Sequence, residues 1–109
     1  MTLQAIIGAV QNYLPSADIE IIRKAYSFVI ERHQGQIRAS GEPYISHVQE
    51  VALLTAKLGL DVSSVTTALL HDTVEDTGTT LTDLRLEFGN EVAELVDGVS
   101  KLNQVNFSS

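Results

Sequence analysis

The sequence predicts an all-α fold, a bundle of about five or six short helices. Apolar residues recur three and four positions apart in successive segments, which is the spacing of a buried helical stripe. No segment of useful length alternates apolar and polar residues with the period of two that a strand requires. With 109 residues, 44% of them apolar and only two prolines, the chain fits one globular domain over residues 1–109.

The first two helices are expected over residues 2–14 and 17–33. Pro15 ends the first helix because its ring and missing N–H forbid continuation, and Ser16 is placed to cap the second. The apolar stripe of the second helix consists of Ile19, Ile22, Tyr26, Val29 and Ile30. The period then breaks down in HQGQIRASGEPYISH, which is rich in Gly, Ser and Gln and predicts a loop.

Two longer helices follow the loop. The third resumes the helical period at Ile45 and stops at Gly59. Its apolar set is Ile45, Val48, Val51, Ala52, Thr55 and Leu58. Asp61 can cap the fourth helix, which is expected to run from about Val62 through HDTVED and to end near Thr77-Gly78.

Two further helices complete the expected bundle. Thr80 and Asp83 have the spacing of a capping box, opening a helix that Gly89 closes, and Asn90 caps the last helix. The apolar set of this last helix is Val92, Leu95, Val96, Val99 and Leu102. The final residues, KLNQVNFSS, form neither a capped helix nor a polar tail, which is typical of a chain cut inside a larger unit.

Composition limits the possible partners. The net charge of −7, from 14 acidic and 7 basic residues, repels a phosphate backbone and argues against direct nucleic-acid binding. No stretch approaches the roughly 18 to 20 apolar residues that a membrane span requires. The start lacks the features of a secretory signal and the chain has no cysteine, so a cytoplasmic location is expected. An anionic ligand would need a metal ion or a few arginines to bind.

The segment HDTVED, residues 71–76, places one histidine and three carboxylates behind an apolar stretch. On a continuous helix His71 stacks with Glu75, and Asp72 stacks with Asp76 one turn later. Carboxylates this close, at a helix end whose dipole opposes them, are unfavourable unless a cation neutralises them. A divalent metal held by His71 and Asp72 would do so, leaving Glu75 and Asp76 to position or deprotonate a bound water. The alternative, a solvated helix end, stays open.

The loop and its flanks supply further candidates. His47, at the start of the third helix, could face the end of the fourth and complete a metal site. Arg38 offers a fork of donors suited to a phosphate or a base. A purely structural role for either residue stays open. His33, at the end of the second helix, is assigned a structural role, and Tyr44 is assigned only to ordering the turn at Pro43.

Three blocks taken together, HQGQIRASGEPYISH, ALLHDTVEDT and FGNEVAELVDGVSKL, closely resemble the hydrolase domain of the RelA/SpoT homologue family of alarmone enzymes over about residues 20–105. The resemblance implies an all-helical member of the HD superfamily. It implies hydrolysis of the 3′ diphosphate of guanosine tetra- and pentaphosphate, normally with Mn²⁺, to GDP or GTP and pyrophosphate. Such domains belong to larger stringent-response enzymes, many of which also carry a synthetase domain.

The resemblance also implies roles for single residues. His47, His71 and Asp72 match the metal ligands of the family. Glu75 and Asp76 match its acidic pair, which is implicated in activating or orienting the attacking water. Mn²⁺ accepts this mixture of nitrogen and oxygen ligands and acts as a Lewis acid on a phosphoryl oxygen.

The loop and the end of the chain depart from the family pattern. Arg38 aligns with a residue of the nucleotide site, and Ser40 is a weaker substrate-binding candidate. Ala39 stands where a lysine is usual, and Val48 stands where a proline commonly follows the histidine. The family's fourth metal ligand is an aspartate in a later motif like DRLHN, which this chain lacks. The 109 residues alone are therefore expected to bind metal weakly and to turn over little or nothing.

Two alternatives to the alarmone hydrolase remain. The chain could be a structural or regulatory HD module that retains the motif without using it. It could also be an HD phosphohydrolase of another nucleotide, which Ala39 keeps open. In either case, the apolar surface of an incomplete bundle predicts some self-association.

Overall fold

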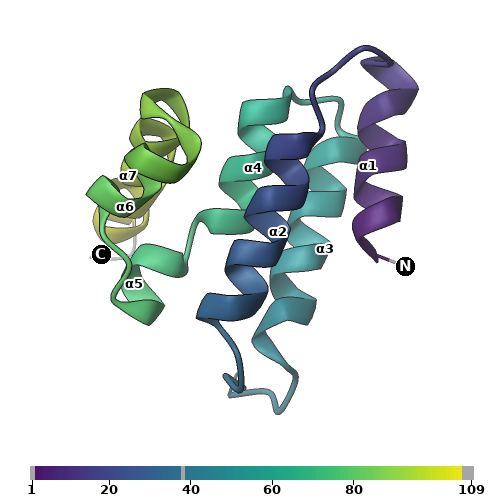
Figure 1. Ribbon diagram of the computed structural model, residues 1–109. Helices are drawn as coiled ribbons and strands as arrows, with labels where there is room; N and C mark the ends of the chain where they lie inside the picture. The colour runs from purple at the N-terminus through teal and green to yellow at the C-terminus, as the bar shows by residue number, and fades with distance from the viewer. Residues whose placement is uncertain (1, 38, 107–109) are drawn as a thin grey trace.

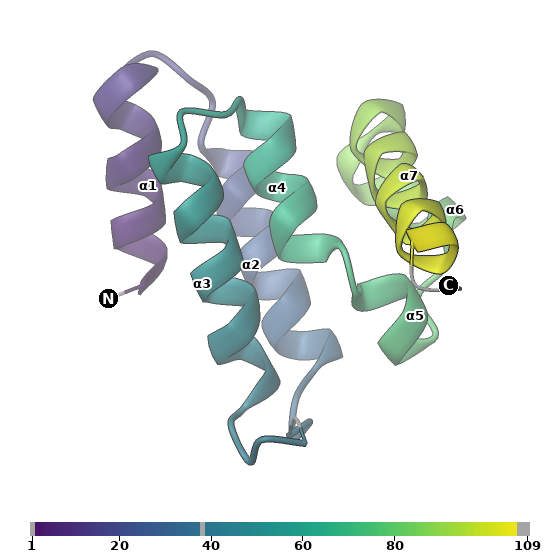
Figure 2. The ribbon, with the colours of Figure 1, turned by 180° about the vertical axis from the view of Figure 1, so that it is seen from behind.

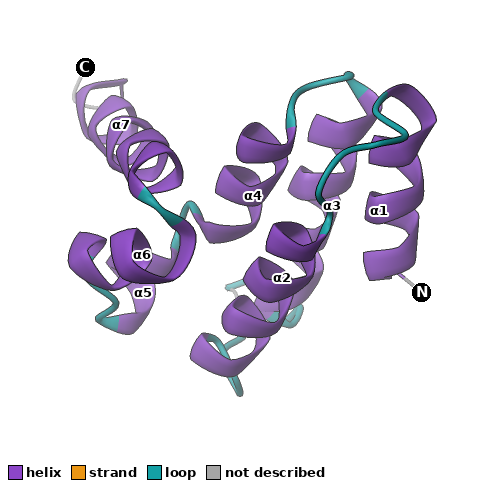
Figure 3. Cartoon of the chain, turned by 45° about the horizontal axis from the view of Figure 1, so that its top comes forward, coloured by secondary structure: helices purple, strands orange, loops and turns teal. Residues whose placement is uncertain are grey.

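The computed structural model describes residues 2–37 and 39–106, with only the backbone described for Thr2, Glu75 and residues 102–106. Within these ranges the chain forms helices joined by loops, without a strand (Figure 3). In chain order the helices are α1 (Thr2–Tyr13), α2 (Glu20–Arg32), α3 (Tyr44–Lys57), α4 (Val62–Leu70), α5 (Thr73–Thr77), α6 (Leu81–Phe88) and α7 (Asn90–Asn106). The predicted all-α class is confirmed.

The helices fall into two groups. Helices α1 to α4 lie side by side, and α6 and α7 form a pair beyond α4, on the side away from α1 (Figures 1 and 2). Helix α4 packs against α2, α3 and α7, while the short α5 leads from α4 to the second group and contacts α2. The core residues come from both groups: Ile6, Val10, Ile22, Val29, Val48, Ala52, Val65, Leu69, Leu70, Leu84, Phe88, Val92 and Val96.

Helix α4 is the centre of the fold. All six residues from Val65 to Leu70 are buried, as expected for a helix that is covered on several sides. The hydroxyls of Thr66 and Thr67 donate to the backbone oxygens of Val62 and Ser63, at 2.8 and 2.7 Å, so neither is left without a partner in the core. The residues that follow Leu70 are therefore held at the junction of three helices.

Several predicted helix ends are confirmed. The carboxylate of Asp61 caps α4 by accepting a hydrogen bond from the backbone N–H of Ser64, at 2.8 Å. Thr80 and Asp83 form the capping box of α6. The chain leaves α3 at Gly59, whose φ of +79° lies in the left-handed region that glycine adopts readily. Local side-chain chemistry thus fixes these boundaries.

The start of α2 was predicted incorrectly. The helix begins at Glu20, its N-cap position is Ile19 without a side-chain hydrogen bond, and Ser16 does not cap it. Asp18 instead accepts a hydrogen bond from the backbone N–H of Glu20, at 3.0 Å. This short turn lets the chain pass from Pro15 into the helix.

The predicted single helix from Val62 to Thr77 is wrong, because it is interrupted at His71 and Asp72. Asp72 has φ of −98° and ψ of −4°, at the sparsely populated edge of the helical region. Helix α5 follows and ends at Gly78, whose φ is +76°. The interruption separates α5 from α4 and gives the described chain seven helices.

Some apolar residues predicted to be buried are exposed. Ile30, Leu58 and Leu95 have relative exposures of 44%, 69% and 40%. The other large apolar residues at the surface of the described part of the chain are Ile37, Leu54, Leu60 and Leu86. Self-association through such a surface stays a prediction. Among the described residues, no helix has the length and apolar character needed to cross a membrane.

Candidate metal centre

The candidate site lies where α2, α3, α4 and α5 meet, at the end of the first group that also carries the α2–α3 loop (Figure 1). His33 follows the last residue of α2, while Tyr44 and His47 lie in the first turn of α3. His71 follows α4 directly, and Asp76 belongs to α5. Residues from four helices thus converge on one place.

Three of the predicted ligands are close enough to share one metal ion. One ring nitrogen each of His47 and His71 and a carboxylate oxygen of Asp72 all lie within 4.8 Å of one another. The centroids of the two histidine rings are 6.4 Å apart. Two imidazoles and one carboxylate suit Mn²⁺, Fe²⁺ or Zn²⁺, and three protein ligands leave coordination positions for water and substrate. The arrangement is a possible His/Asp metal site.

The orientation of His71 fits metal binding. Its Nδ1 lies 2.8 Å from the backbone oxygen of Ala68, and because a carbonyl oxygen only accepts, Nδ1 carries a proton and donates. Its Nε2 faces Asp72 Oδ2 at 3.1 Å. A carboxylate oxygen also only accepts, so this contact is favourable when a proton or a cation lies between the two atoms. A backbone partner of this kind is typical of metal-binding histidines.

The carboxylate of Asp72 is partly buried yet kept ionised. Burial alone would raise the pKa of Asp72, but hydrogen bonds from His71 and Tyr44, together with the charge of His71 and His47, lower it below its ordinary value. The carboxylate makes no capping bond to α5, although Asp72 occupies the N-cap position. An ionised oxygen directed away from its own helix is what a metal ligand requires.

Tyr44 is a member of the site that the sequence did not identify. Its hydroxyl lies 2.7 Å from Asp72 Oδ2 and 2.5 Å from Asp76 Oδ2. Burial raises the pKa of Tyr44 above its ordinary value, and the hydrogen bonds to Asp76 and Asp72 raise it further, so the hydroxyl stays protonated and donates. The available signal was its position three residues before His47, which places both on one face of α3.

Of the acidic pair, Glu75 and Asp76, the structure describes the side chain of Asp76 alone. Asp76 is exposed, and its backbone N–H donates to the backbone oxygen of Asp72 at 3.0 Å, so the predicted one-turn spacing of these two residues is present. His71 lies within the interruption, so His71 and Glu75 do not share one continuous helix. The side chain of Glu75 lies outside the described part of the chain.

A polar hollow of about 540 Å³ opens beside Asp76. It is lined by Gln36, Ile37, Ala39, Tyr44 and Asp76. Of the predicted substrate residues, Arg38 lies outside the described residues. Ser40 is exposed and accepts a long hydrogen bond of 3.5 Å from the backbone N–H of Glu42, and it is not among the residues lining the hollow.

The candidate metal centre also borders an apolar hollow of about 330 Å³, which is lined by residues of α3, α4 and α7. His71 stands at its border, and the other lining residues are Val51, Thr55, Leu60, Ser64, Thr67, Ala68, Leu95 and Val99. His71 thus lies between the polar residues of the candidate site and an apolar lining.

The sequence pattern of the HD domain matches residues 25–109, and the chain therefore belongs to the HD domain family. Three curated relatives are similar to nearly the whole chain. A probable GTP pyrophosphokinase of Mycobacterium leprae is 46% identical over 107 residues, which are 98% of this chain and 14% of the relative. The bifunctional (p)ppGpp synthase/hydrolase SpoT of Escherichia coli K12 is 48% identical over 98 residues, 90% of this chain and 14% of SpoT.

A third relative, the guanosine-3′,5′-bis(diphosphate) 3′-pyrophosphohydrolase of Aquifex aeolicus, is 48% identical over 90 residues, 83% of this chain and 13% of the relative. The predicted resemblance to RelA/SpoT proteins is confirmed by these matches. The chain spans only about one seventh of the length of these relatives.

Proposed function

We propose that this chain supplies metal-binding and catalytic residues of an enzyme that hydrolyses the 3′ diphosphate of guanosine tetra- and pentaphosphate. One observation carries the proposal: His47, His71 and Asp72 converge within 4.8 Å in a chain of the HD domain family. The names of the relatives support the substrate, because several are guanosine-3′,5′-bis(diphosphate) 3′-pyrophosphohydrolases.

In this proposal His47, His71 and Asp72 hold Mn²⁺. The ion would supply Lewis-acid polarisation of a phosphoryl oxygen, would lower the pKa of a coordinated water, and would offset the acidic charge of the chain. The fixed Nδ1 of His71 and the ionised carboxylate of Asp72 support this assignment.

The carboxylates of α5 act on the attacking water. Asp76, and Glu75 beside it, would orient this water and accept its proton. The water oxygen forms a bond to the phosphorus next to the ribose 3′ oxygen, and the bond from that phosphorus to the 3′ oxygen breaks. The 3′ oxygen takes up a proton to become a hydroxyl, and pyrophosphate leaves. The hollow of about 540 Å³ beside Asp76 is of a size suited to a nucleotide and is the candidate substrate site.

The experiment transplants the chain into a complete relative. In a chimera, this chain replaces the matching segment of Escherichia coli SpoT, with which it shares 48% identity. We expect Mn²⁺-dependent release of pyrophosphate from guanosine tetraphosphate, and we expect a chelator to abolish it. Asp72→Asn should reduce the rate more than about 100-fold, because loss of a ligand should cost more than the roughly 10 to 100-fold typical for a residue that only hydrogen-bonds to a ligand. Asp61→Asn, at the far end of α4, is the matched control and should leave the rate unchanged.

Two results would contradict the proposal. One is a folded chimera that binds Mn²⁺ yet releases no pyrophosphate under conditions where SpoT does. The other is hydrolysis of a different nucleotide in a substrate panel, with guanosine tetraphosphate left intact. The first result would favour a structural or regulatory module, and the second a phosphohydrolase of other nucleotides.

A further inference from the structure

Tyr44 joins the two carboxylates of the site through a single atom. Its hydroxyl oxygen is 2.7 Å from Asp72 Oδ2 and 2.5 Å from Asp76 Oδ2. A phenol has one proton to donate, so both carboxylates compete for the same donor and are drawn to the same point. The hydroxyl therefore sets the distance between the proposed metal ligand and the proposed base.

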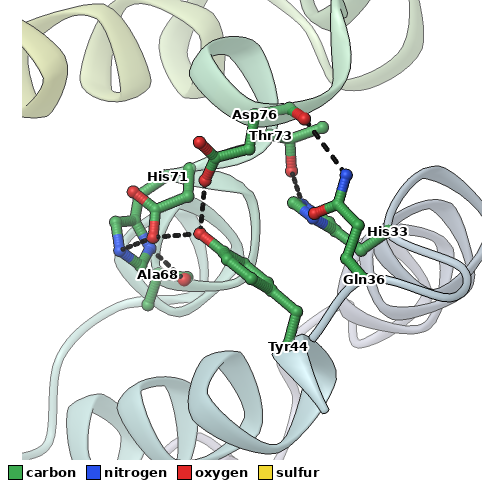
Figure 4. Close-up of polar contacts among 8 residues, drawn as sticks. His33, Gln36, Tyr44, Ala68, His71, Thr73 and Asp76 are labelled. Carbon is green, nitrogen blue, oxygen red and sulfur yellow. Dashed lines mark hydrogen bonds and ion pairs between the residues drawn. The ribbon is translucent and has the colours of Figure 1, made fainter. Parts of the chain in front are cut away.

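The ring of Tyr44 is held by two histidine rings, one against its face and one at its edge. It stacks on His33 with ring centroids 4.3 Å apart and planes 3° from parallel. His47 meets the ring at its edge, with centroids 6.4 Å apart and an interplanar angle of 80°. Figure 4 shows the Tyr44 ring between His71 on one side and His33 with Gln36 on the other, with Asp76 beyond its hydroxyl.

His33 is anchored at both ring nitrogens. The side chain is only 4% exposed. Its Nδ1 lies 2.9 Å from Gln36 Oε1, and its Nε2 lies 3.3 Å from Thr73 Oγ1 in α5. Gln36 in turn donates from Nε2 to the backbone oxygen of Asp76, at 3.1 Å. The end of α2 is thus tied to α5 at two places.

Backbone contacts join the two ends of the α2–α3 loop next to Tyr44. Ile37 and Pro43 form an antiparallel bridge, and the backbone N–H of Tyr44 donates to the backbone oxygen of Gln36, at 3.1 Å. The residue that holds the carboxylates and the residues that support it are therefore connected through both backbone and side chains.

We infer that Tyr44 is a positioning residue of the metal centre, which places Asp72 for the cation and Asp76 for the attacking water, and that His33 acts through Tyr44. This inference rests on the proposed function. Ligand carboxylates in metal sites are commonly held by hydrogen bonds of this kind, and losing such a bond typically weakens metal affinity by about 10 to 100-fold. His33, which the sequence suggested was merely structural, thereby gains an indirect role in metal binding.

The test removes the hydroxyl alone. Tyr44→Phe keeps the ring and its stacking, and Mn²⁺ affinity of the SpoT chimera is measured by electron paramagnetic resonance of the free ion. We expect an affinity about 10 to 100-fold lower than in the wild type. The matched control is Tyr26→Phe, because the hydroxyl of Tyr26 also links α2 to α3, by accepting from Gln49, and is not part of the site. This control should change affinity less than about twofold.

A double-mutant cycle separates positioning from general stability. His33→Asn should weaken Mn²⁺ binding in the wild type and have a clearly smaller effect in the Tyr44→Phe background, because His33 acts through the hydroxyl that is already gone. Additive effects would overturn the role of His33. A folded Tyr44→Phe variant that binds Mn²⁺ as tightly as the wild type would overturn the role of Tyr44.

The positioning of Asp76 for the attacking water is tested by steady-state kinetics of the SpoT chimera at saturating Mn²⁺. Tyr44→Phe should lower kcat by about tenfold or more, because Asp76 loses the hydrogen bond that holds it in place. A folded SpoT chimera whose HD domain binds no Mn²⁺ would refute the metal centre and the proposed function together. Binding that is indifferent to Tyr44→Phe would refute the positioning role alone.

Discussion

Asp61 and Asp72 occupy the same position at the start of two consecutive helices but use their carboxylates differently. Asp61 precedes α4 and accepts a hydrogen bond from the backbone N–H of Ser64, at 2.8 Å. Asp72 precedes α5 and makes no such bond. Its Oδ2 lies instead 3.1 Å from His71 Nε2 and 2.7 Å from the hydroxyl of Tyr44.

The pKa is lowered at both residues, for different reasons. Hydrogen bonds from Ser64 lower the pKa of Asp61, which is exposed. At Asp72, burial opposes ionisation and is outweighed by hydrogen bonds from His71 and Tyr44. A capping carboxylate typically stabilises a helix by about 1 kcal/mol. Helix α5, only five residues long, lacks this contribution because its N-cap carboxylate is part of the site.

The largest expected difference between the two aspartates concerns metal binding. Mn²⁺ at 100 times its Kd should stabilise the wild-type chain by about 2.7 kcal/mol, which raises the Tm of a domain of this size on the order of 10 °C. Asp72→Asn should abolish this shift, and Asp61→Asn should retain it. Thermal unfolding followed by circular dichroism, with and without Mn²⁺, measures both. Equal shifts in the two variants would remove the functional distinction between these residues.

In the metal-free chain, Asp61 rather than Asp72 is expected to contribute to stability, and the effect is smaller. Asp61→Ala removes the cap of α4 and should lower the free energy of unfolding by about 1 kcal/mol in urea denaturation. Asp61→Asn should cost much less, because asparagine caps as well as aspartate. If the two substitutions at this position were equally costly, charge rather than capping would explain the contribution of Asp61.

The smallest effect is the pH dependence of this cap. Because folding lowers the pKa of Asp61 below its ordinary value of 3.8, its contribution is complete above that value and is lost as pH falls through the folded-state pKa. The stability difference between the wild type and Asp61→Ala should therefore narrow below about pH 4. Urea denaturation from pH 6 to pH 3 measures it. A difference that stays constant over this range would show that ionisation of Asp61 does not contribute.

Several predicted features that depend on near neighbours in sequence are confirmed, although the predicted cap of α2 at Ser16 is not. The cap at Asp61, the capping box of α6 and the stop at Gly59 each involve residues a few positions apart. The convergence of His47 with His71 and Asp72 was anticipated from three spaced motifs acting together. Their roles as ligands stay a prediction until metal binding is measured.

The interruption of the fourth helix could not be predicted from local pattern. The stretch VTTALLHDTVED contains neither glycine nor proline to mark a helix end, and the chain leaves the helix where Asp72 reaches Tyr44, 28 residues earlier. The place of Tyr44 was missed for the same reason, since its partners lie in α5 and in the α4–α5 turn. The contact between His33 and Thr73 spans 40 residues and was equally hidden. Such contacts depend on tertiary packing.

The central claim is that His47, His71 and Asp72 hold one divalent cation. It is tested most directly by diffraction from crystals of the chain grown with Mn²⁺, recorded at the manganese absorption edge. The account predicts one anomalous peak per chain, bonded to a ring nitrogen of each histidine and to the Asp72 carboxylate. A well-ordered site with no peak there, or a peak coordinated by other residues, would contradict it.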